Sequence, residues 1–235
     1  MMPRMAGKRL IQILGLLAAV MTFGFTAGTA GAATITADPT CCTFTAGPFT
    51  QAPGEQSVFD NPPEGAFHNV TSTSRGPDGG DLFISETVRG GSNVPVAGTE
   101  YLAAGTYPFV CTLHPGMNGD LVVGGSGTAV PRPSVTLAVP SQKLKQIQKT
   151  RKVKVKVKAR SLSKGVTVRL LKGKQKLSAP VKLNLAAGAT KTVVIKLNAA
   201  GRKAVKNVKK GKKLNVAVSS TVPFGKPARA SRNLR

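Results

Sequence analysis

Three residues that can bind a soft metal ion lie close together in the segment Cys111-Thr-Leu-His114-Pro-Gly-Met117. The chain has only 2 histidines, and the other, His68, lies upstream in Ala-Phe-His-Asn-Val. After residue 32, Met117 is also the only methionine. A thiolate, two imidazoles and a distant axial thioether form the ligand set of a type 1 (blue) copper site. These residues predict one ion that alternates between Cu(I) and Cu(II), bound by His68, Cys111, His114 and Met117.

The spacing of these residues suits a single ion held at a tight turn. A Cys at the end of one strand and a His three residues later can reach the same ion, while Pro115 and Gly116 bend the chain so that Met117 returns from the axial side. A lone Cys-x-x-His occurs by chance, and a single His on an apolar strand is usually a packed residue. Here both histidines and the methionine share one pattern, which favours a metal site.

The segment from Gly105 to Val123 resembles the cupredoxin family, and within it the plastocyanin and amicyanin branch. The shared pattern is Gly-Thr-Tyr before an aromatic strand, then Cys-x-x-His, Met and Gly, then a valine-rich strand. The two residues between His114 and Met117 match the short, amicyanin-like version of the loop.

The same resemblance implies roles for residues around the ligands. Asn69 follows His68 as in the family, and is expected to hydrogen-bond Thr112 and the Cys111 sulfur. Partners of this kind hold metal ligands rigid. The resemblance further implies that His114 lies near the surface, where electrons enter and leave.

The beginning of the chain predicts export. Arg4, Lys8 and Arg9 precede an apolar stretch, residues 10–30, and Ala30-Gly-Ala32 offers a cleavage site before Ala33. This pattern is typical of a signal peptide, residues 1–32. A membrane anchor would need a longer uninterrupted apolar core and no cleavage site, so we expect no transmembrane anchor in the mature chain. The expected location is periplasmic, cell-envelope associated or extracellular.

The chain has 3 cysteines, of which Cys41 and Cys42 are adjacent and Cys111 is the odd one. An odd thiol in an exported protein needs a reason, and copper binding is one. Cys41 and Cys42 could form a disulfide with each other, link to another chain, or remain reduced as an accessory copper or redox site. An oxidising compartment favours the disulfide between neighbours.

Charge divides the mature chain into two unlike halves. Residues 33–130 contain all 9 acidic residues and only two basic ones, a net charge of −7, whereas residues 131–235 contain 29 of the 34 Lys and Arg and no Asp or Glu. A Gly-rich and then Pro-rich stretch lies at the boundary, as in linkers. The predicted units are a cupredoxin domain at 33–123, a linker at 124–133, a basic sandwich at 134–222 and a basic tail at 223–235.

The pattern of short apolar segments bounded by turn residues predicts an all-β protein, with a cupredoxin-like Greek-key sandwich followed by a second small sandwich. The strands expected in the first half are Thr43–Phe49, Gln56–Phe59, Phe67–Ser72, Asp81–Glu86, Thr99–Leu102, Gly105–Cys111 and Gly119–Val123.

In the second half, Lys152–Lys158 alternates Lys and Val, which is typical of a strand buried on one face. Similar stretches follow at residues 166–171, 181–185, 192–197 and 214–218, and residues 198–208 predict a short helix with Asn198 as its N-cap. This pattern resembles the lysine-rich, immunoglobulin-like modules appended to exported bacterial proteins.

The basic half is expected to tether the protein to an anionic polymer of the cell envelope or to a membrane surface. Lysines on strand faces also prevent edge pairing, so a plain spacer is the simpler alternative. A third alternative is docking against the acidic half of the same or another molecule. Specific nucleic-acid recognition is not expected, because Phe224 is the only aromatic residue after residue 130.

The ligand set favours a one-electron carrier that exchanges electrons with a redox protein. The alternative is an extracytoplasmic copper binding or delivery protein, which would need exchangeable metal and could recruit Cys41 and Cys42. An enzyme such as a copper oxidase or nitrite reductase is not expected, because a catalytic copper needs further imidazoles and both histidines are already used. A Ser or Cys nucleophile would likewise lack a histidine base.

Overall fold

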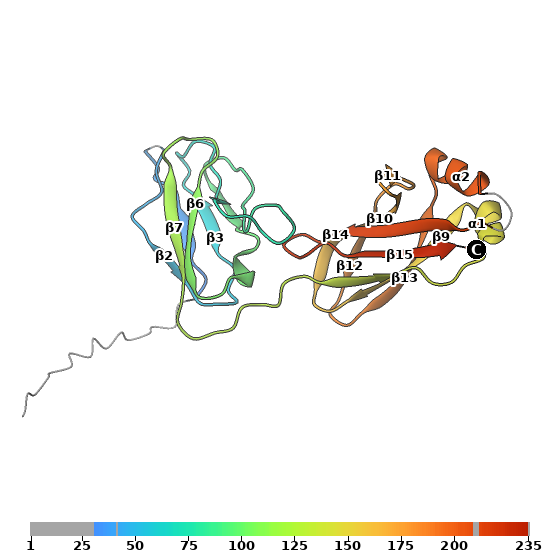
Figure 1. Cartoon of the computed structure of the whole chain (residues 1–235). Helices are drawn as coiled ribbons and strands as arrows, with labels where there is room; N and C mark the ends of the chain where they lie inside the picture. The colour runs from blue at the N-terminus through green and yellow to red at the C-terminus, as the bar shows by residue number, and fades with distance from the viewer. Residues whose placement is uncertain (1–30, 41, 209–211, 235) are drawn as a thin grey trace, which may run out of the picture.

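The computed structural model describes residues 31–40, 42–208 and 212–234. Residues 1–30 of the predicted signal peptide therefore lie outside the described part of the chain, and so does Cys41. Within the described ranges the chain is built from strands, with two short α-helices and one 3-10 helix, so the predicted all-β class is confirmed. No helix in these ranges is long and apolar enough to cross a membrane. Figure 1 shows two β bodies in succession.

The first half is a sandwich of two sheets. Its elements, in the described residues, are β1 (Thr34–Thr36), β2 (Phe49–Gln51), β3 (Val58–Asn61), β4 (Thr71–Ser72), β5 (Ser92–Pro95), the 3-10 helix η1 (Thr99–Tyr101), β6 (Gly105–Val110) and β7 (Asn118–Val123). One sheet has the order β1-β3-β5 and the other β2-β7-β6-β4. Ile35 and Phe59 from the first sheet share one buried core with Phe109 and Leu121 from the second.

The β6–β7 hairpin positions the metal-binding segment. The two strands pair from Gly105 opposite Val123 to Val110 opposite Asn118, so residues 111–117 form their connection. Gly119 lies opposite Phe109, and a Cβ atom at Gly119 would approach the Phe109 Cζ atom to 2.7 Å. The absence of a side chain at Gly119 therefore lets the Phe109 ring fill the core beneath the connection.

Four predicted strands of the first half are wrong in whole or in large part. Thr43–Phe49 and Phe67–Ser72 are strand only at Phe49 and at Thr71–Ser72. The other two contain no strand at all. Residues 99–101 form η1, because Gly98 adopts a left-handed φ of 102° and the Thr99 hydroxyl donates to the Val96 carbonyl. Residues 81–86 form only isolated bridges, for example from Ile84 to Ala97. β-Branched and aromatic residues suggested strands at both places, but local hydrogen bonds decided the backbone at the first.

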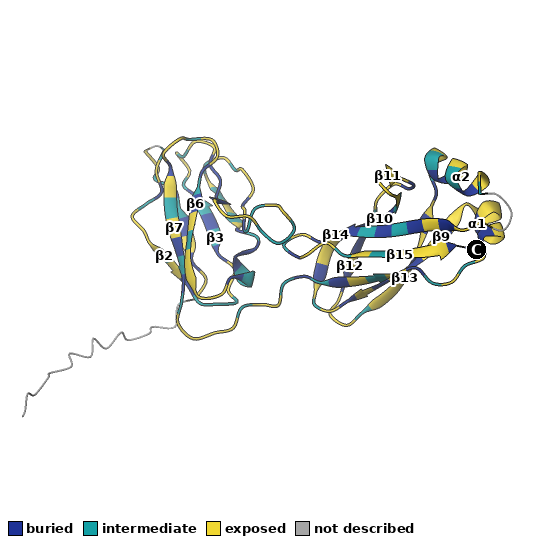
Figure 2. Ribbon diagram, viewed as in Figure 1, coloured by how far each residue is buried: buried dark blue, intermediate teal, exposed yellow. Residues whose placement is uncertain are grey.

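The second half is also a sandwich of two sheets. Its described elements are β8 (Val135–Ala138), α1 (Leu144–Thr150), β9 (Lys152–Ala159), β10 (Ser163–Lys172), β11 (Gln175–Lys176), β12 (Val181–Leu185), β13 (Thr190–Lys196), α2 (Ala199–Lys206), β14 (Leu214–Thr221) and β15 (Arg229–Leu234). One sheet has the order β13-β9-β8, and the other β11-β10-β14-β15 with β12 also paired to β10. Along β9 the valines are buried and the lysines exposed, as the alternation predicts, and Figure 2 shows buried and exposed positions on both bodies.

The end of the chain differs from the expectation of a basic tail. Residues 229–234 form β15, which pairs with β14 from Leu214 opposite Leu234 to Ser219 opposite Arg229. The segment is polar except at Ala230 and Leu234, so apolar alternation does not reveal it. The helix at residues 198–208 is confirmed as α2, and the Asn198 side chain accepts a hydrogen bond of 2.8 Å from the Gly201 amide, as expected of an N-cap.

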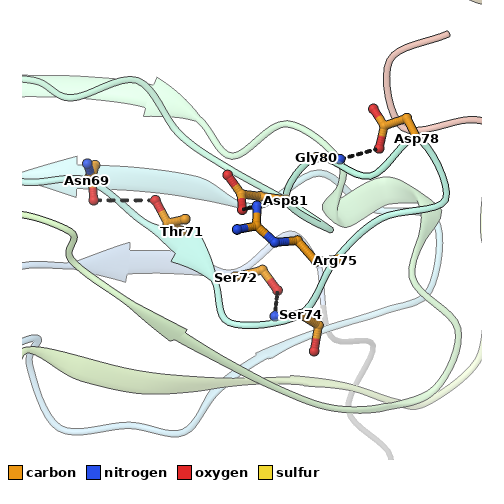
Figure 3. Close-up of polar contacts among 8 residues, drawn as sticks. All are labelled: Asn69, Thr71, Ser72, Ser74, Arg75, Asp78, Gly80 and Asp81. Carbon is orange, nitrogen blue, oxygen red and sulfur yellow. Dashed lines mark hydrogen bonds and ion pairs between the residues drawn. The ribbon is translucent and has the colours of Figure 1, made fainter. Parts of the chain in front are cut away.

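The turn between β14 and β15 contacts the first half of the chain. The Phe224 amide donates to Asp78 Oδ2 over 2.9 Å, and the Phe224 ring lies 6.0 Å from the Tyr101 ring between centroids. Arg132 donates to the Phe224 carbonyl and places its guanidinium 5.8 Å from the Tyr101 ring centroid. Figure 3 shows Asp78 in its loop beside the reddish ribbon of the second half. These contacts join the two halves of one chain over a small area that we call the clasp.

The clasp lies far from residues 111–117. Tyr101 precedes the start of β6 and Cys111 follows its end, so the six residues of the strand separate them by about 20 Å. Burial and the neighbouring Glu100 carboxylate raise the pKa of Tyr101 to about 12, so its ring remains a neutral phenol under the Arg132 guanidinium at neutral pH. The second half is therefore held at the opposite end of β6 from the metal-binding segment.

We expect Phe224→Ala to release the clasp, because it removes the ring contact with Tyr101. An aromatic pair of this kind contributes about 1 kcal/mol beyond the area that it buries. The radius of gyration from small-angle X-ray scattering should increase, whereas Phe67→Ala, which removes an exposed Phe from the first half, should leave it unchanged. Equal scattering from the wild type and both variants would show that Phe224 does not hold the halves together.

Candidate metal site

Two separate segments bring the predicted ligands together. Cys111 directly follows β6, and its amide donates to the Met117 carbonyl while the Met117 amide donates to the His114 carbonyl. His68 comes from another part of the chain, where its amide and carbonyl pair with Val88 over 3.1 and 3.0 Å. These backbone bonds hold the turn and the His68 segment in register with the two sheets.

The side chains of His68, Cys111 and His114 converge on one point. The Cys111 Sγ atom lies 3.7 Å from His68 Nδ1 and 3.7 Å from His114 Nδ1. One donor atom from each of the three side chains lies within 4.8 Å of the others. Metal bonds from Cys sulfur and His nitrogen are about 2.0–2.3 Å long, so atoms at these separations can share one ion. A soft thiolate between two imidazoles is a donor set that suits copper.

The environment keeps His68 ready to bind a metal. Burial, and secondarily the nearby His114, lower the pKa of His68, so the ring is neutral at neutral pH and has a free lone pair. Its Nε2 atom is buried and has no hydrogen-bond partner among the described residues. The other ring nitrogen, Nδ1, faces the Cys111 sulfur. A metal on Nδ1 would place the ring proton on Nε2.

Asn69 connects the two segments through Thr112, one of the two partners that the resemblance implied. The other, a bond to the Cys111 sulfur, is not formed among the described residues, where that sulfur lies against His68 and His114. The Asn69 Oδ1 atom accepts from the Thr112 amide over 2.9 Å, and its Nδ2 atom donates to Thr112 Oγ1 over 2.7 Å. The same Nδ2 atom donates to Thr87 Oγ1, a partner that sequence reasoning missed because nothing in the local pattern identifies it. Figure 3 shows the further bond from the Thr71 hydroxyl to Asn69. Thr112 follows Cys111 directly, so these bonds hold the backbone next to the sulfur.

We expect Asn69→Ala to fold but to lose both stability and copper affinity. The variant loses three bonds of 2.7–2.9 Å and one long bond of 3.5 Å. At about 1 kcal/mol for each short bond, the free energy of unfolding of the metal-free protein should fall by about 3 kcal/mol. The copper affinity should fall by about 10- to 100-fold, as is usual when partners of metal ligands are removed. Urea denaturation and competitive copper titration measure the two effects. Thr87→Ala is the matched control, because it removes one bond and keeps both to Thr112; an equal loss of affinity there would contradict this role for Asn69.

Met117 lies on the same turn as Cys111 and His114, and its side chain is buried in the core of the first half. Its carbonyl accepts from the Cys111 amide, so the residue lies beside Cys111 where the turn closes. The structure thus brings three predicted ligands together and places the fourth on their loop.

The surroundings of the two histidines differ. His68 is fully buried, whereas His114 is only partly buried, on the side of the site that faces solvent. Two apolar neighbours, Phe67 and Leu113, are 55% and 47% exposed. Sequence reasoning did not single them out, since exposure of an apolar residue cannot be read from its type.

The other two cysteines lie apart from this cluster. Cys42 is disulfide-bonded, and Cys111 is the one free, buried thiol in the described residues. Cys41, the expected partner of Cys42, is outside the described part of the chain. An accessory site that uses the Cys42 thiol is therefore not formed in this state.

No protein-family profile and no curated protein matches the chain. Among solved structures, the chain is similar to the oxidized state of an amicyanin mutant, with 23% identity and a TM-score of 0.33 over 40% of this chain and 83% of that chain. Amicyanin from Paracoccus versutus is 20% identical with a TM-score of 0.31, over 40% and 81% of the two chains. A marsupial T cell receptor is 12% identical with a TM-score of 0.30, over 78% and 93%. The metal assignment depends on the positions of His68, Cys111 and His114, and not on these likenesses.

Proposed function

We propose that the chain is an exported type 1 copper protein that transfers single electrons. One copper ion would be held by His68, Cys111 and His114 together with Met117, and would supply the one-electron chemistry by alternating between Cu(I) and Cu(II). The observation that carries this proposal is the position of the Cys111 sulfur between two imidazole Nδ1 atoms, 3.7 Å from each.

The rigidity of the site supports electron transfer. Metal ligands that do not move on oxidation or reduction keep the energetic cost of electron transfer small. Asn69 holds the residue after Cys111, and the β6–β7 pairing closes the loop at both ends. His114 reaches the surface from the buried cluster, which gives electrons a short path to a redox partner.

The alternative is copper binding and delivery, which needs metal that leaves readily. That function would be helped by an additional pair of thiols near the surface. Cys42 is disulfide-bonded, so its thiol is not available in this state. The disulfide and the hydrogen-bonded ligand loop both favour the electron carrier. An oxidase or reductase is disfavoured because both histidines of the chain are used in one site.

The proposal also includes the second half, which we assign to tethering on an anionic surface outside the cytoplasm. Its support is the concentration of 29 Lys and Arg after residue 130 with no acidic side chain. The clasp at the far end of β6 leaves the His114 side of the first half uncovered by the second half. A tethered carrier of this kind keeps its copper site accessible to a redox protein.

The experiment that tests the function is Cu(II) titration of the mature protein, followed by visible absorption and electron paramagnetic resonance. We expect an intense thiolate-to-copper band that saturates at one equivalent, a narrow copper hyperfine splitting, and reversible bleaching on reduction and reoxidation. A pale spectrum typical of ordinary Cu(II) would contradict the type 1 site. Metal that leaves on reduction would support delivery instead.

A further inference from the structure

Residues of α1, of α2 and of the segments next to them line a pocket. Figure 1 shows these two helices at the end of the second half farthest from the turn that contacts the first half. The volume of the pocket is about 530 Å³, within the usual range for small-ligand sites. Four basic residues line it: Arg151, which follows α1, and Arg202, Lys203 and Lys206, all from α2.

The walls of this pocket are held together by hydrogen bonds. Gln148 of α1 donates from Nε2 to the Val205 carbonyl of α2 over 3.1 Å. The Leu197 amide donates to the Arg151 carbonyl over 2.9 Å, and Arg202 Nη1 donates to the Leu197 carbonyl over 3.3 Å. The two helices and the end of β13 therefore form one connected frame, so the basic side chains project from backbone that is already ordered.

The floor of the pocket is apolar. Ile147, Leu197 and Val205 line it, and all three belong to the buried core of the second half. No acidic side chain follows Asp120 in the sequence, so this half offers no carboxylate side chain to neutralise the four cations. An anion from solution would relieve their mutual repulsion.

We propose that this pocket binds a segment of an anionic envelope polymer. The segment consists of one phosphate group and the alcohol units bonded to it. A guanidinium presents a planar fork of donors that matches phosphate, and both Arg151 and Arg202 reach the pocket. A phosphate offers acceptor oxygens in several directions, whereas a carboxylate offers them in one plane. Cations from two segments, Arg151 after α1 and three residues of α2, therefore favour phosphate. The space beyond a single phosphate admits the neighbouring polyol. This inference rests on the proposed tether and gives it a defined site.

The position of the pocket suits a tether. The two helices lie at the opposite end of the second half from the turn that contacts the first half (Figure 1). A polymer bound between the helices therefore leaves the clasp and the first half free. By comparison, the exposed lysines of β9 lie on a sheet face and form an open row, which attracts polyanions without enclosing one group.

The test compares two variants that remove equal charge from the full mature chain. One double variant, Lys203→Gln/Lys206→Gln, removes two charges from the pocket. The other, Lys156→Gln/Lys158→Gln, removes two charges from the exposed row of lysines on β9. The probe is linear inorganic polyphosphate, with polyglutamate as the carboxylate counterpart, and binding is measured by isothermal titration calorimetry at fixed salt. We expect the pocket variant to lose about tenfold or more in affinity for polyphosphate, because a hydrogen bond to a charged group contributes about 1.5–3 kcal/mol. The β9 variant should lose about twofold.

Other results would overturn the proposal in distinguishable ways. Equal losses of affinity in the two variants would show that polyphosphate binds over the whole basic surface. The phosphate site in the pocket would then be refuted, while tethering by the basic half would still be supported. Equal affinity of the wild type for polyphosphate and polyglutamate would refute the preference for phosphate. No binding of the wild type to either polymer would refute pocket and tether together, and the copper spectrum would still report the electron carrier separately.

A further variant, Arg202→Lys, keeps the charge but removes the fork of donors. We expect it to weaken polyphosphate binding more than polyglutamate binding. Equal weakening for both polymers would contradict a role for the guanidinium in recognising phosphate. Thermal melting of each variant against the wild type checks that the α1–α2 frame has not unfolded.

Discussion

Cys111→Ser is expected to abolish the intense visible band of the copper-loaded protein. The band comes from charge transfer between a thiolate and Cu(II), and Cys111 is the free thiol of the cluster. A serine hydroxyl is a poorer ligand for copper, so the copper affinity should also fall by orders of magnitude. Visible absorption and copper titration of the purified variant measure both effects.

Met117→Leu is the matched control for this experiment. It replaces the buried thioether by an aliphatic side chain of similar volume, which a packed core tolerates. We expect this variant to keep copper and colour but to show a changed reduction potential, because the axial ligand tunes it. An intense band in Cys111→Ser would refute the metal assignment, and loss of copper from Met117→Leu would show that Met117 does more than tune the site.

The second large effect is expected in the salt dependence of binding to polyanions. If the second half neutralises 6–10 phosphates, the affinity of the full mature chain for polyphosphate should fall by about 10³-fold or more between about 50 and 200 mM salt. The physical reason is that bound cations release counterions from the polymer, and salt opposes that release. Binding measured over a salt series gives the slope directly.

A fragment of residues 33–130 is the control, because its net charge is −7 and it has a hydrophobic core of its own. It should bind copper with the colour of the full chain but should not bind polyphosphate. Binding by the fragment, or binding of the full chain that does not change with salt, would contradict tethering by the basic half.

The strongly alternating parts of the second half could be predicted from sequence. The Lys-Val alternation of β9, the strand β12 and the helix α2 with its Asn198 cap all appear where they were expected. In each case a local pattern and the tertiary environment agree, since one face is apolar and the other polar. β15 and α1 were missed because they are short or polar, and their place depends on pairing with β14 and on packing against α2.

The first half shows the same limit. β6 and β7 were predicted to within one residue, whereas Thr99–Tyr101 forms a 3-10 helix in place of a strand. A buried hydrogen bond from the Ser57 amide to the Thr99 hydroxyl comes from a distant segment and cannot be inferred from the Thr99 neighbourhood. Propensity therefore failed where the left-handed Gly98 and the local bond of the Thr99 hydroxyl set the backbone, and where a long-range bond to the same hydroxyl adds to them.

The types and spacing of four residues determined the chemistry expected of this protein, because few donor sets combine one thiolate, two imidazoles and one thioether. The charge division was likewise evident from the sequence alone. Only the tertiary structure decided that His68 Nδ1 approaches a sulfur 43 residues away. It also decided that Phe224 contacts the loop of Asp78, and that four cations gather between α1 and α2. The reason is physical: local patterns report which face of an element is buried, whereas packing among distant segments selects which side chains meet.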